Sequence, residues 1–171
     1  MLDFFGHGSC VPSTIIKLKE SMKLKQDVEL MIKCTEKPKL RTFVTFKDFG
    51  PTPVYLLKPI SFVQKKFIAQ LRLSALPIKI ETGRYERPKL AVHERLCPSC
   101  NDGQSIENEE HFMLTCPKHS FRRIILYSKI ENITNFSEKN NIEKLKFLFN
   151  DASVVKASSQ YILDSFAARS A

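Results

Sequence analysis

CPSCNDGQSIENEEHFMLTC, residues 97 to 116, places four potential ligands of a soft metal ion within twenty residues. They follow the order C-x2-C-x10-H-x4-C and are Cys97, Cys100, His111 and Cys116. Thiolate and imidazole are the ligands that zinc prefers in tetrahedral structural sites, and a two-residue gap lets two sulfurs from one tight turn share an ion. The stretch therefore predicts one Zn2+ ion, whose four protein ligands leave no open position for a catalytic water.

The fourth ligand is the position that spacing alone leaves open. His111 and Cys116 lie five residues apart, about 140° around an ideal helix, so a regular helix cannot point both at one ion. A helix that begins near Glu109 is expected to end at Cys116, because Pro117 pushes the preceding residue out of the α region. His119 competes, since Cys116 and His119 form a C-x2-H pair. Spacing favours His111. The alternative interpretation of the stretch is buried thiols without metal, or a disulfide.

The positive charge of the chain is concentrated in one region. Lys and Arg number 27 against 18 Asp and Glu, which gives a net charge of +9. Residues 37 to 95 contain thirteen of the basic residues and only four acids, an excess equal to the whole net charge. The stretch between Cys97 and Cys116 has no Lys or Arg and carries Asp102, Glu107, Glu109 and Glu110. An anionic partner is therefore expected to bind beside the predicted zinc site rather than on it.

A basic excess of this kind is typical of proteins that bind nucleic acid through its phosphates. We expect contacts from a helix near residues 60 to 75, from a loop at 77 to 95 and from the segment after the metal ligands. The candidate side chains are Lys65, Lys66, Arg72, Lys79, Arg84, Arg87, Arg95, Arg122 and Arg123. The expected partner is RNA or DNA, bound with little sequence preference. The alternative is a zinc-stapled structural or protein-interaction domain whose acidic stretch faces a protein partner.

Apolar residues at three- and four-residue steps predict a mainly α protein, a small helical domain with an embedded Cys-Cys-His-Cys zinc knuckle. Three segments are expected: an N-terminal helical segment at 1–59, a core with basic helix, loop and zinc knuckle at 60–135, and a C-terminal helical pair at 136–171. At 171 residues, 43% of them hydrophobic, the chain is long enough to bury one core.

Individual helices follow from the same spacing. Residues 14 to 33 predict an amphipathic helix with apolar side chains at Ile15, Leu18, Met22, Leu24, Val28 and Met31. Residues 40 to 47 predict a short helix that ends by Gly50, and residues 77 to 96 an extended or looped segment. A helix from residue 60 that Pro77 stops is expected to bury Ile60, Val63, Phe67 and Leu71 and to point Lys65, Lys66 and Arg72 outward.

The last part of the chain predicts three further helices. Pro117 is suited to the first turn of one of them, because its fixed φ is already helical. Asn140, with Glu143 three residues later, resembles a capping box. The final helix is expected from about residue 153 to residue 169, with Val155, Ile162 and Phe166 inward.

The location of the protein is predicted from what the chain lacks. Its first residues, MLDFFGHGSC, have no basic stretch followed by an apolar run, and no apolar stretch reaches the length of a membrane span. We therefore expect a protein of the nucleus or cytoplasm without a membrane partner. In such reducing compartments clustered cysteines bind metal more often than they form disulfides. The sequence sets no oligomeric state.

Several strings resemble the C-terminal segment of endonuclease-reverse transcriptase polyproteins of non-LTR retrotransposons. They are PKLRTFVTFKDFG (38–50), IETGRY (80–85), ERLCPSC (94–100), NEEHFMLTCP (108–117) and FSEKNNIEKLKFLFND (136–151). The resemblance spans roughly residues 38 to 169. It implies a zinc knuckle ligated by Cys97, Cys100, His111 and Cys116, with His111 rather than His119 as the histidine. It also implies a role in holding element RNA or target DNA near the polymerase.

The chain departs from that family in its catalytic residues. A polymerase needs paired aspartates to hold its metal ions. The six aspartates of this chain stand singly, at Asp3, Asp27, Asp48, Asp102, Asp151 and Asp164. We therefore expect a protein without polymerase or nuclease activity of its own.

Overall fold

The computed structural model describes residues 13–46, 52–100, 102–130 and 135–169. Within these ranges the protein is mainly α, as predicted, and its only extended pairing is an isolated bridge between Leu96 and Ile106. The helices are α1 (Ser13–Thr35), α2 (Arg41–Phe46), α3 (Val54–Leu57), α4 (Phe62–Arg72), α5 (Lys79–Thr82), α6 (Ser120–Ser128), α7 (Asn141–Asn150) and α8 (Val155–Ala167). Short helical turns lie at Pro38–Leu40, Val92–Glu94, His111–Thr115, Pro117–His119 and Phe136–Glu138.

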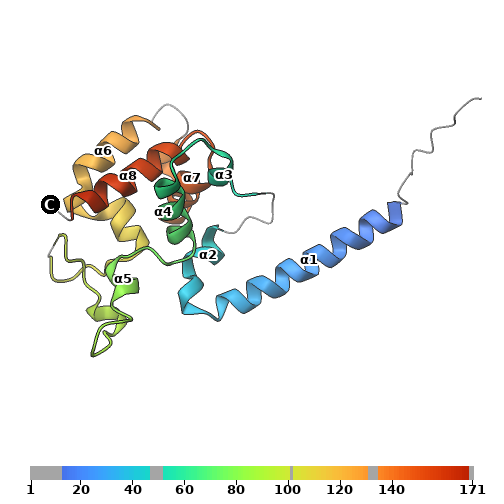
Figure 1. Ribbon diagram of the computed structural model, residues 1–171, viewed down its shortest axis with the longest axis horizontal. Helices are drawn as coiled ribbons and strands as arrows, with labels where there is room; N and C mark the ends of the chain where they lie inside the picture. The colour runs from blue at the N-terminus through green and yellow to red at the C-terminus, as the bar shows by residue number, and fades with distance from the viewer. Residues whose placement is uncertain (1–12, 47–51, 101, 131–134, 170–171) are drawn as a thin grey trace, which may run out of the picture.

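The helical body is organised around α8, which packs against α4, α6 and α7 (Figure 1). Its apolar core contains residues from all three segments that the sequence suggests, among them Phe46, Ile68 and Leu148, each almost fully buried. The ring of Phe46 meets the ring of Phe149 edge-on at 5.7 Å, which joins α2 to α7. A shared core links the three segments, and their division into separate domains stays a prediction.

Two capping boxes set where helices begin. Asn140 and Glu143 exchange side-chain and backbone hydrogen bonds of 3.0 Å, which confirms the predicted start of α7. Ser61 and Gln64 do the same for α4, at 3.2 and 2.9 Å. Helix α4 ends at Arg72, before Pro77 can act, because Ser74 takes the left-handed conformation at φ 54°.

The buried face of α4 agrees with the prediction at Leu71, and the predicted Ile60 and Phe67 pack against the core, but Val63 is 47% exposed. Gln64 and Ile68 are buried instead. The apolar pattern missed Gln64 because it excluded polar side chains. The amide of Gln64 is accommodated there by a hydrogen bond of 3.2 Å to Gln160 on α8.

The prediction that Arg72 points outward was wrong. Its guanidinium turns back into the body, where it donates to the carbonyl of Phe46 at 2.9 Å and also to the side chain of Asn150. It lies 5.8 and 5.9 Å from the ring centroids of Phe46 and Tyr55. The aliphatic stem and planar head of an arginine pack well against aromatic rings, so Arg72 joins α2, α3 and α7.

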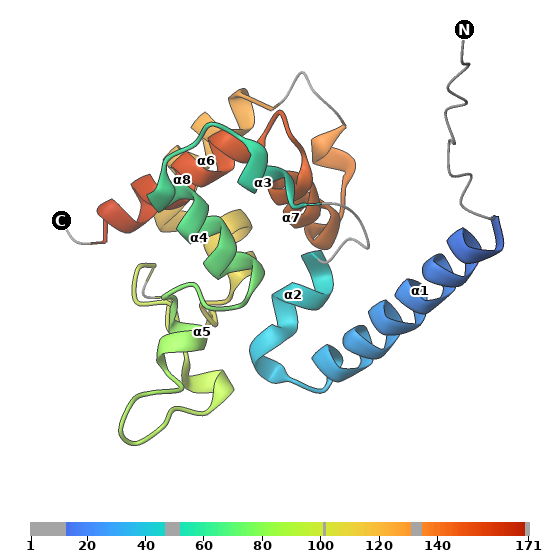
Figure 2. The ribbon, with the colours of Figure 1, turned by 45° about the vertical axis from the view of Figure 1, so that its right-hand side comes forward.

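Helix α1 confirms the predicted helix but not its packing. Figures 1 and 2 show it extending away from the body, to which its C-terminal end is joined. Ile15 and Leu18 at one end and Leu24 and Val28 further along are all exposed. At about 100° per residue these two groups lie on roughly opposite sides of the helix, so no single apolar stripe exists. Only Cys34, in its last turn, is buried.

Two further predicted segments, at 40 to 47 and at 77 to 96, can be compared with the structure. The predicted short helix at 40 to 47 corresponds to α2, and its expected end at Gly50 lies outside the described residues. The predicted loop at 77 to 96 holds the single-turn α5 and the turn Val92–Glu94. None of the described helices combines the length and the apolar character that crossing a bilayer requires.

The burial pattern of α7 predicts which substitutions on this helix will lower the free energy of unfolding. Leu148→Ala should lower the free energy of unfolding by about 2 to 5 kcal/mol, because this fully buried side chain leaves a cavity. Ile142→Ala, on the same helix but 55% exposed, should change it by no more than about 0.5 kcal/mol. Urea unfolding followed by circular dichroism measures both. Equal losses for the two variants would contradict the described orientation of α7.

Candidate metal centre

Four side chains from three turns bring their ligand atoms together. The sulfurs of Cys97, Cys100 and Cys116 and a ring nitrogen of His111 all lie within 4.8 Å of one another. Cys97 Sγ is 3.9 Å from Cys116 Sγ, and Cys100 Sγ is 3.5 Å from His111 Nε2. A tetrahedral zinc ion with bonds of about 2.3 Å to sulfur and 2.0 Å to nitrogen needs edges of about 3.8 and 3.5 Å. The two printed distances match these edges, so the four residues could hold a metal ion such as zinc.

A short hairpin presents the first two cysteines. The amide of Cys97 donates to the carbonyl of Ser105 at 2.8 Å, and the amide of Glu107 donates to the carbonyl of Arg95 at 3.0 Å. Within its tip, the carboxylate of Asp102 accepts hydrogen bonds from the side chain and amide of Ser105, which hold the pKa of Asp102 at about 2. Gly103, at φ 69°, supplies the left-handed residue that this turn needs.

Two Cys-Pro turns of the same form hold the sulfurs. The first is residues 97 to 100, Cys-Pro-Ser-Cys, and the second is residues 116 to 119, Cys-Pro-Lys-His. In each turn the backbone amides two and three positions after the cysteine donate to its sulfur. Amide donors stabilise a thiolate, so both turns are suited to hold Cys97 and Cys116 as charged ligands.

A widened helical turn brings His111 and Cys116 to one side. The turn His111–Thr115 has π-helical hydrogen bonding, and the amide of Cys116 donates to the carbonyl of His111 at 2.7 Å. An i to i+5 hydrogen bond places residue 116 nearly above residue 111, which removes the angular conflict of a regular helix. Cys116 then leaves the helix at ψ 119°, as the following Pro117 requires. The expected end at Cys116 is confirmed, and the π geometry is the part that spacing did not predict.

Two hydrogen bonds hold His111, one at its ring and one at its backbone amide. Its ring Nδ1 lies 3.3 Å from Thr115 Oγ1, and its backbone amide donates to Asn108 Oδ1 at 2.7 Å. A partner for Nδ1 orients the ring and directs Nε2 at the metal position. Burial lowers the pKa of His111, which favours the neutral imidazole that a metal needs.

For the cysteines, burial disfavours the form that binds metal, because that form is the charged thiolate. Burial raises the pKa of Cys97 to about 12 and also raises the pKa of Cys116. The thiols are therefore protonated at neutral pH until a cation compensates their charge. A site of this kind takes up a metal ion by releasing protons.

Glu107 is a residue of the site that sequence reasoning did not single out as structural. It is almost fully buried, and one carboxylate oxygen lies 3.6 Å from Cys97 Sγ. The same carboxylate accepts the backbone amide of Lys79 at 2.6 Å and pairs with Arg169. It thus connects the cysteine hairpin to α5 and to the end of α8. Only its tertiary partners reveal this role, because its sequence neighbours resemble a polar loop.

Glu109 is buried in the same way. It pairs with Arg41 of α2 at 2.5 Å, and burial raises its pKa despite that partner. Two of the four acids in the stretch therefore point into the protein instead of toward a partner. This outcome removes part of the acidic surface on which the protein-interaction alternative was based.

His119 lies near the cluster but is not one of its members. The side chain is 1% exposed, and its ring meets the rings of Phe112 and Tyr161 edge-on, with centroids 5.1 and 6.4 Å apart. Burial, with Arg169 as the next cause, lowers the pKa of His119 to about 4. The geometry places His111, not His119, in the group of four.

The basic candidates from the sequence fall into two groups. The first has partners inside the protein. Arg95 is 4% exposed and donates to the carbonyls of Ile80 and Leu90, both at 2.8 Å. Further internal contacts link Lys65 to the carbonyl of Leu56, Lys79 to Glu86, Arg84 to Glu81 and Arg123 to the carbonyl of Cys116. With Arg72, these side chains have structural contacts of their own.

The second group faces solvent. Lys66 and Arg87 are exposed, and Arg122 is half-buried. Lys118, directly after the second Cys-Pro turn, is exposed as well. These residues are available to an external anion without breaking an internal contact described above.

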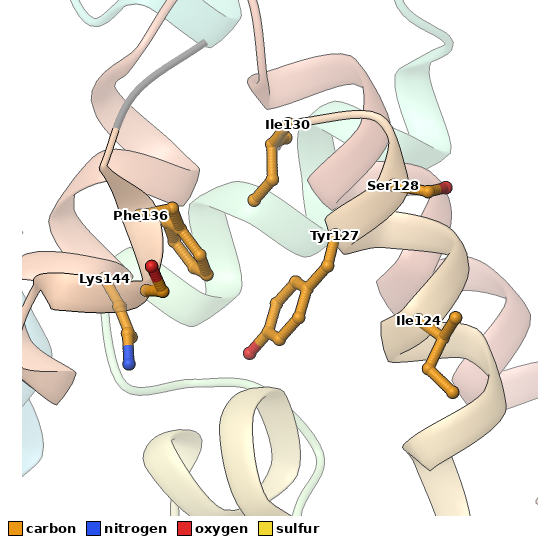
Figure 3. Close-up of a pocket in the computed structure, with 7 residues that line it drawn as sticks. Ile124, Tyr127, Ser128, Ile130, Phe136 and Lys144 are labelled. Carbon is orange, nitrogen blue, oxygen red and sulfur yellow. The ribbon is translucent and has the colours of Figure 1, made fainter. Parts of the chain in front are cut away.

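The largest cavity described lies away from the metal cluster, between α6 and the chain that leads into α7. Its volume is about 440 Å³. Figure 3 shows Tyr127 and Phe136 side by side in its lining, and their rings meet edge-on with centroids 5.0 Å apart. Its lining is mostly apolar, with one ammonium group from Lys144.

No family model, curated protein or solved structure matches this chain. What the geometry itself shows is a helical domain with a buried cluster of three cysteines and one histidine that could bind a metal ion such as zinc.

The cluster predicts one zinc ion per chain. Cys100→Ser and His111→Ala should each lose stoichiometric zinc and loosen residues 94 to 120, because structural zinc in small modules contributes on the order of 10 kcal/mol. Cys34→Ser and His119→Phe are the matched controls, since neither residue belongs to the cluster. Elemental analysis of the purified variants gives the metal content. Full zinc in Cys100→Ser, or zinc lost only in His119→Phe, would contradict the ligand set.

The raised thiol pKa values predict a steep pH dependence of metal affinity. Each thiol that is protonated in the metal-free fold must release its proton when zinc binds, so a fall in pH favours the metal-free form. Zinc affinity, measured by competition with a chelator between pH 6 and 8, should fall about tenfold for each unit by which the pH is lowered and for each proton released on binding. An affinity that does not vary with pH after correction for the chelator would show that the thiols do not bind the metal.

Proposed function

We propose that this protein is a non-catalytic nucleic-acid-binding module whose fold is organised by a structural zinc ion. The observation that carries the proposal is a closed Cys-Cys-His-Cys cluster within a chain of net charge +9. Four protein ligands complete a tetrahedral zinc site, which leaves the ion no position for substrate or water. The role of the metal is then to hold the hairpin, the π-turn and α6 in one arrangement.

The internal ion pairs do not reduce the net positive charge of the protein. Each pair removes one cation and one acid, so the excess of nine charges stays on side chains without such a partner. The pairs are Lys33 with Glu29, Arg41 with Glu109, Lys79 with Glu86, Arg84 with Glu81, and Arg169 with Glu107. A net positive surface attracts the phosphates of RNA and DNA and releases their counterions, with little dependence on base sequence.

The family resemblance supports the same function. In retrotransposon polyproteins the corresponding segment follows the polymerase domain, and this chain has no adjacent aspartates that could serve a polymerase. We propose that the protein derives from such a segment and keeps a nucleic-acid-binding role without the chemistry. RNA and DNA are both accommodated by this proposal.

One observation favours a second candidate, a zinc-stapled protein-interaction domain. Helix α1 extends from the body (Figure 2). It carries large apolar side chains exposed on both sides, including Leu18 and Leu24. Exposed apolar residues in this number are typical of surfaces that meet another protein. In this second candidate the zinc cluster only stabilises the body from which α1 extends.

The proposal predicts salt-dependent binding that depends on the solvent-facing cations. Changing Lys66, Arg87 and Arg122 together to Gln should flatten the plot of log affinity against log salt by about 2 units, because each phosphate neutralised on single-stranded RNA accounts for about 0.7 of the slope. Fluorescence anisotropy with labelled RNA and duplex DNA between 50 and 200 mM salt measures the slope. Zinc content and helicity should stay unchanged, because these side chains support no described core contact.

A variant with the same charge change is the control. Lys17, Lys19 and Lys23 all lie on α1, outside the basic region, and their joint replacement by Gln also removes three charges. A smaller effect of this control supports the proposed surface. Absence of binding at low salt would instead favour the protein-interaction candidate, and equal effects of both triple variants would mean that net charge alone is responsible.

A further inference from the structure

The two Cys-Pro turns enclose a second cavity beside the metal cluster. Its volume is about 310 Å³, which is at the lower end of the range for small-ligand sites. Its lining is formed by Pro98, Ser99, Lys118, His119, Ala168 and Arg169. The first turn, the second turn and the end of α8 each contribute one pair of neighbouring residues. The cavity therefore exists only when the metal ligands and α8 are assembled.

His119 is the unusual residue in this cavity. It is 1% exposed, and neither of its ring nitrogens has a hydrogen-bond partner among the described residues. Leaving a buried polar group without a partner costs about 1 to 3 kcal/mol, so an imidazole with two such atoms requires an explanation. Its aromatic contacts with Phe112 and Tyr161 account for the ring but not for the nitrogens. A ligand that accepts a hydrogen bond from the ring would account for one of them.

The charges around His119 favour an anion. The groups that act on its ring are Arg169, Arg122, Arg123 and His111, and each of them disfavours an added positive charge. Lys118 is exposed and lines the cavity. Against these cations stand Glu107, which pairs with Arg169, and one net negative charge from a zinc ion with three thiolates. Four cations against two negative charges leave a positive balance of two.

We infer that this cavity binds a backbone phosphate of a nucleic acid. Lys118 supplies the charge, the hydroxyl of Ser99 and the unpartnered Nε of Arg169 can donate to phosphate oxygens, and the neutral ring of His119 donates from one nitrogen. The inference rests on the proposed function and gives it a location. It also assigns a role to the second Cys-Pro turn, which positions Cys116 for the metal and Lys118 and His119 for the phosphate.

The test uses the zinc-loaded full chain and the imidazole resonances of His119 in NMR at constant pH and ionic strength. Inorganic phosphate and a short single-stranded RNA are added separately, with sodium chloride as the control for ionic strength. Both phosphate and RNA should shift the His119 ring, and chloride should not. Lys118→Gln should weaken RNA binding several-fold and lower the salt slope by about 0.7. Lys129→Gln, which removes the same charge from an exposed site outside the cavity, should have a smaller effect.

The outcomes separate this inference from the proposed function. If RNA binds by anisotropy while the His119 ring stays unshifted, or if the Lys118 and Lys129 variants lose equal affinity, the cavity is not the phosphate site and the function still stands. If phosphate shifts the ring while RNA does not bind, nucleic acid is overturned as the occupant together with the proposed function. A shift with RNA that Lys118→Gln reduces and Lys129→Gln does not supports the inference.

Discussion

The π-turn between His111 and Cys116 is the constraint on which the site depends. A regular helix would direct these two side chains about 140° apart, and no single ion could bind both. The hydrogen bond of 2.7 Å from the amide of Cys116 to the carbonyl of His111 widens the turn by one residue and brings both ligand atoms to the hairpin cysteines. π-Turns are uncommon and occur often at functional sites, which agrees with the position of this one.

The same turn connects the metal cluster to the helical core. Between the two ligands, Phe112, Met113 and Leu114 are buried in the core, and the hydroxyl of Tyr161 on α8 donates to the carbonyl of Phe112 at 2.9 Å. On the hairpin side, the buried ion pair of Glu107 and Arg169 joins the cysteines to the end of the same helix. Metal binding and packing of α8 are therefore coupled, because each holds the turn in the form that the other needs.

The internal ion pairs sort the charged residues into two classes. Arginines such as Arg41 and Arg95 stabilise the fold by holding carboxylates and carbonyls that would otherwise be buried without partners. Lysines such as Lys66 and Lys118 stay at the surface, where their charge can act on an external anion. The guanidinium group suits the first role because it presents several donors in one plane.

The sequence by itself determined the features that neighbouring residues control. Ligand spacing identified the three cysteines and favoured His111 over His119, Pro117 ended the turn at Cys116, and Asn140 with Glu143 started α7. Tertiary structure alone decided the rest. Gln64 reaches the buried face of α4 through a partner on α8, Arg72 turns inward to the rings of Phe46 and Tyr55, and α1 finds no surface to cover. The physical reason is that backbone geometry and caps depend on residues a few positions apart, whereas burial of a polar side chain depends on partners distant in the chain.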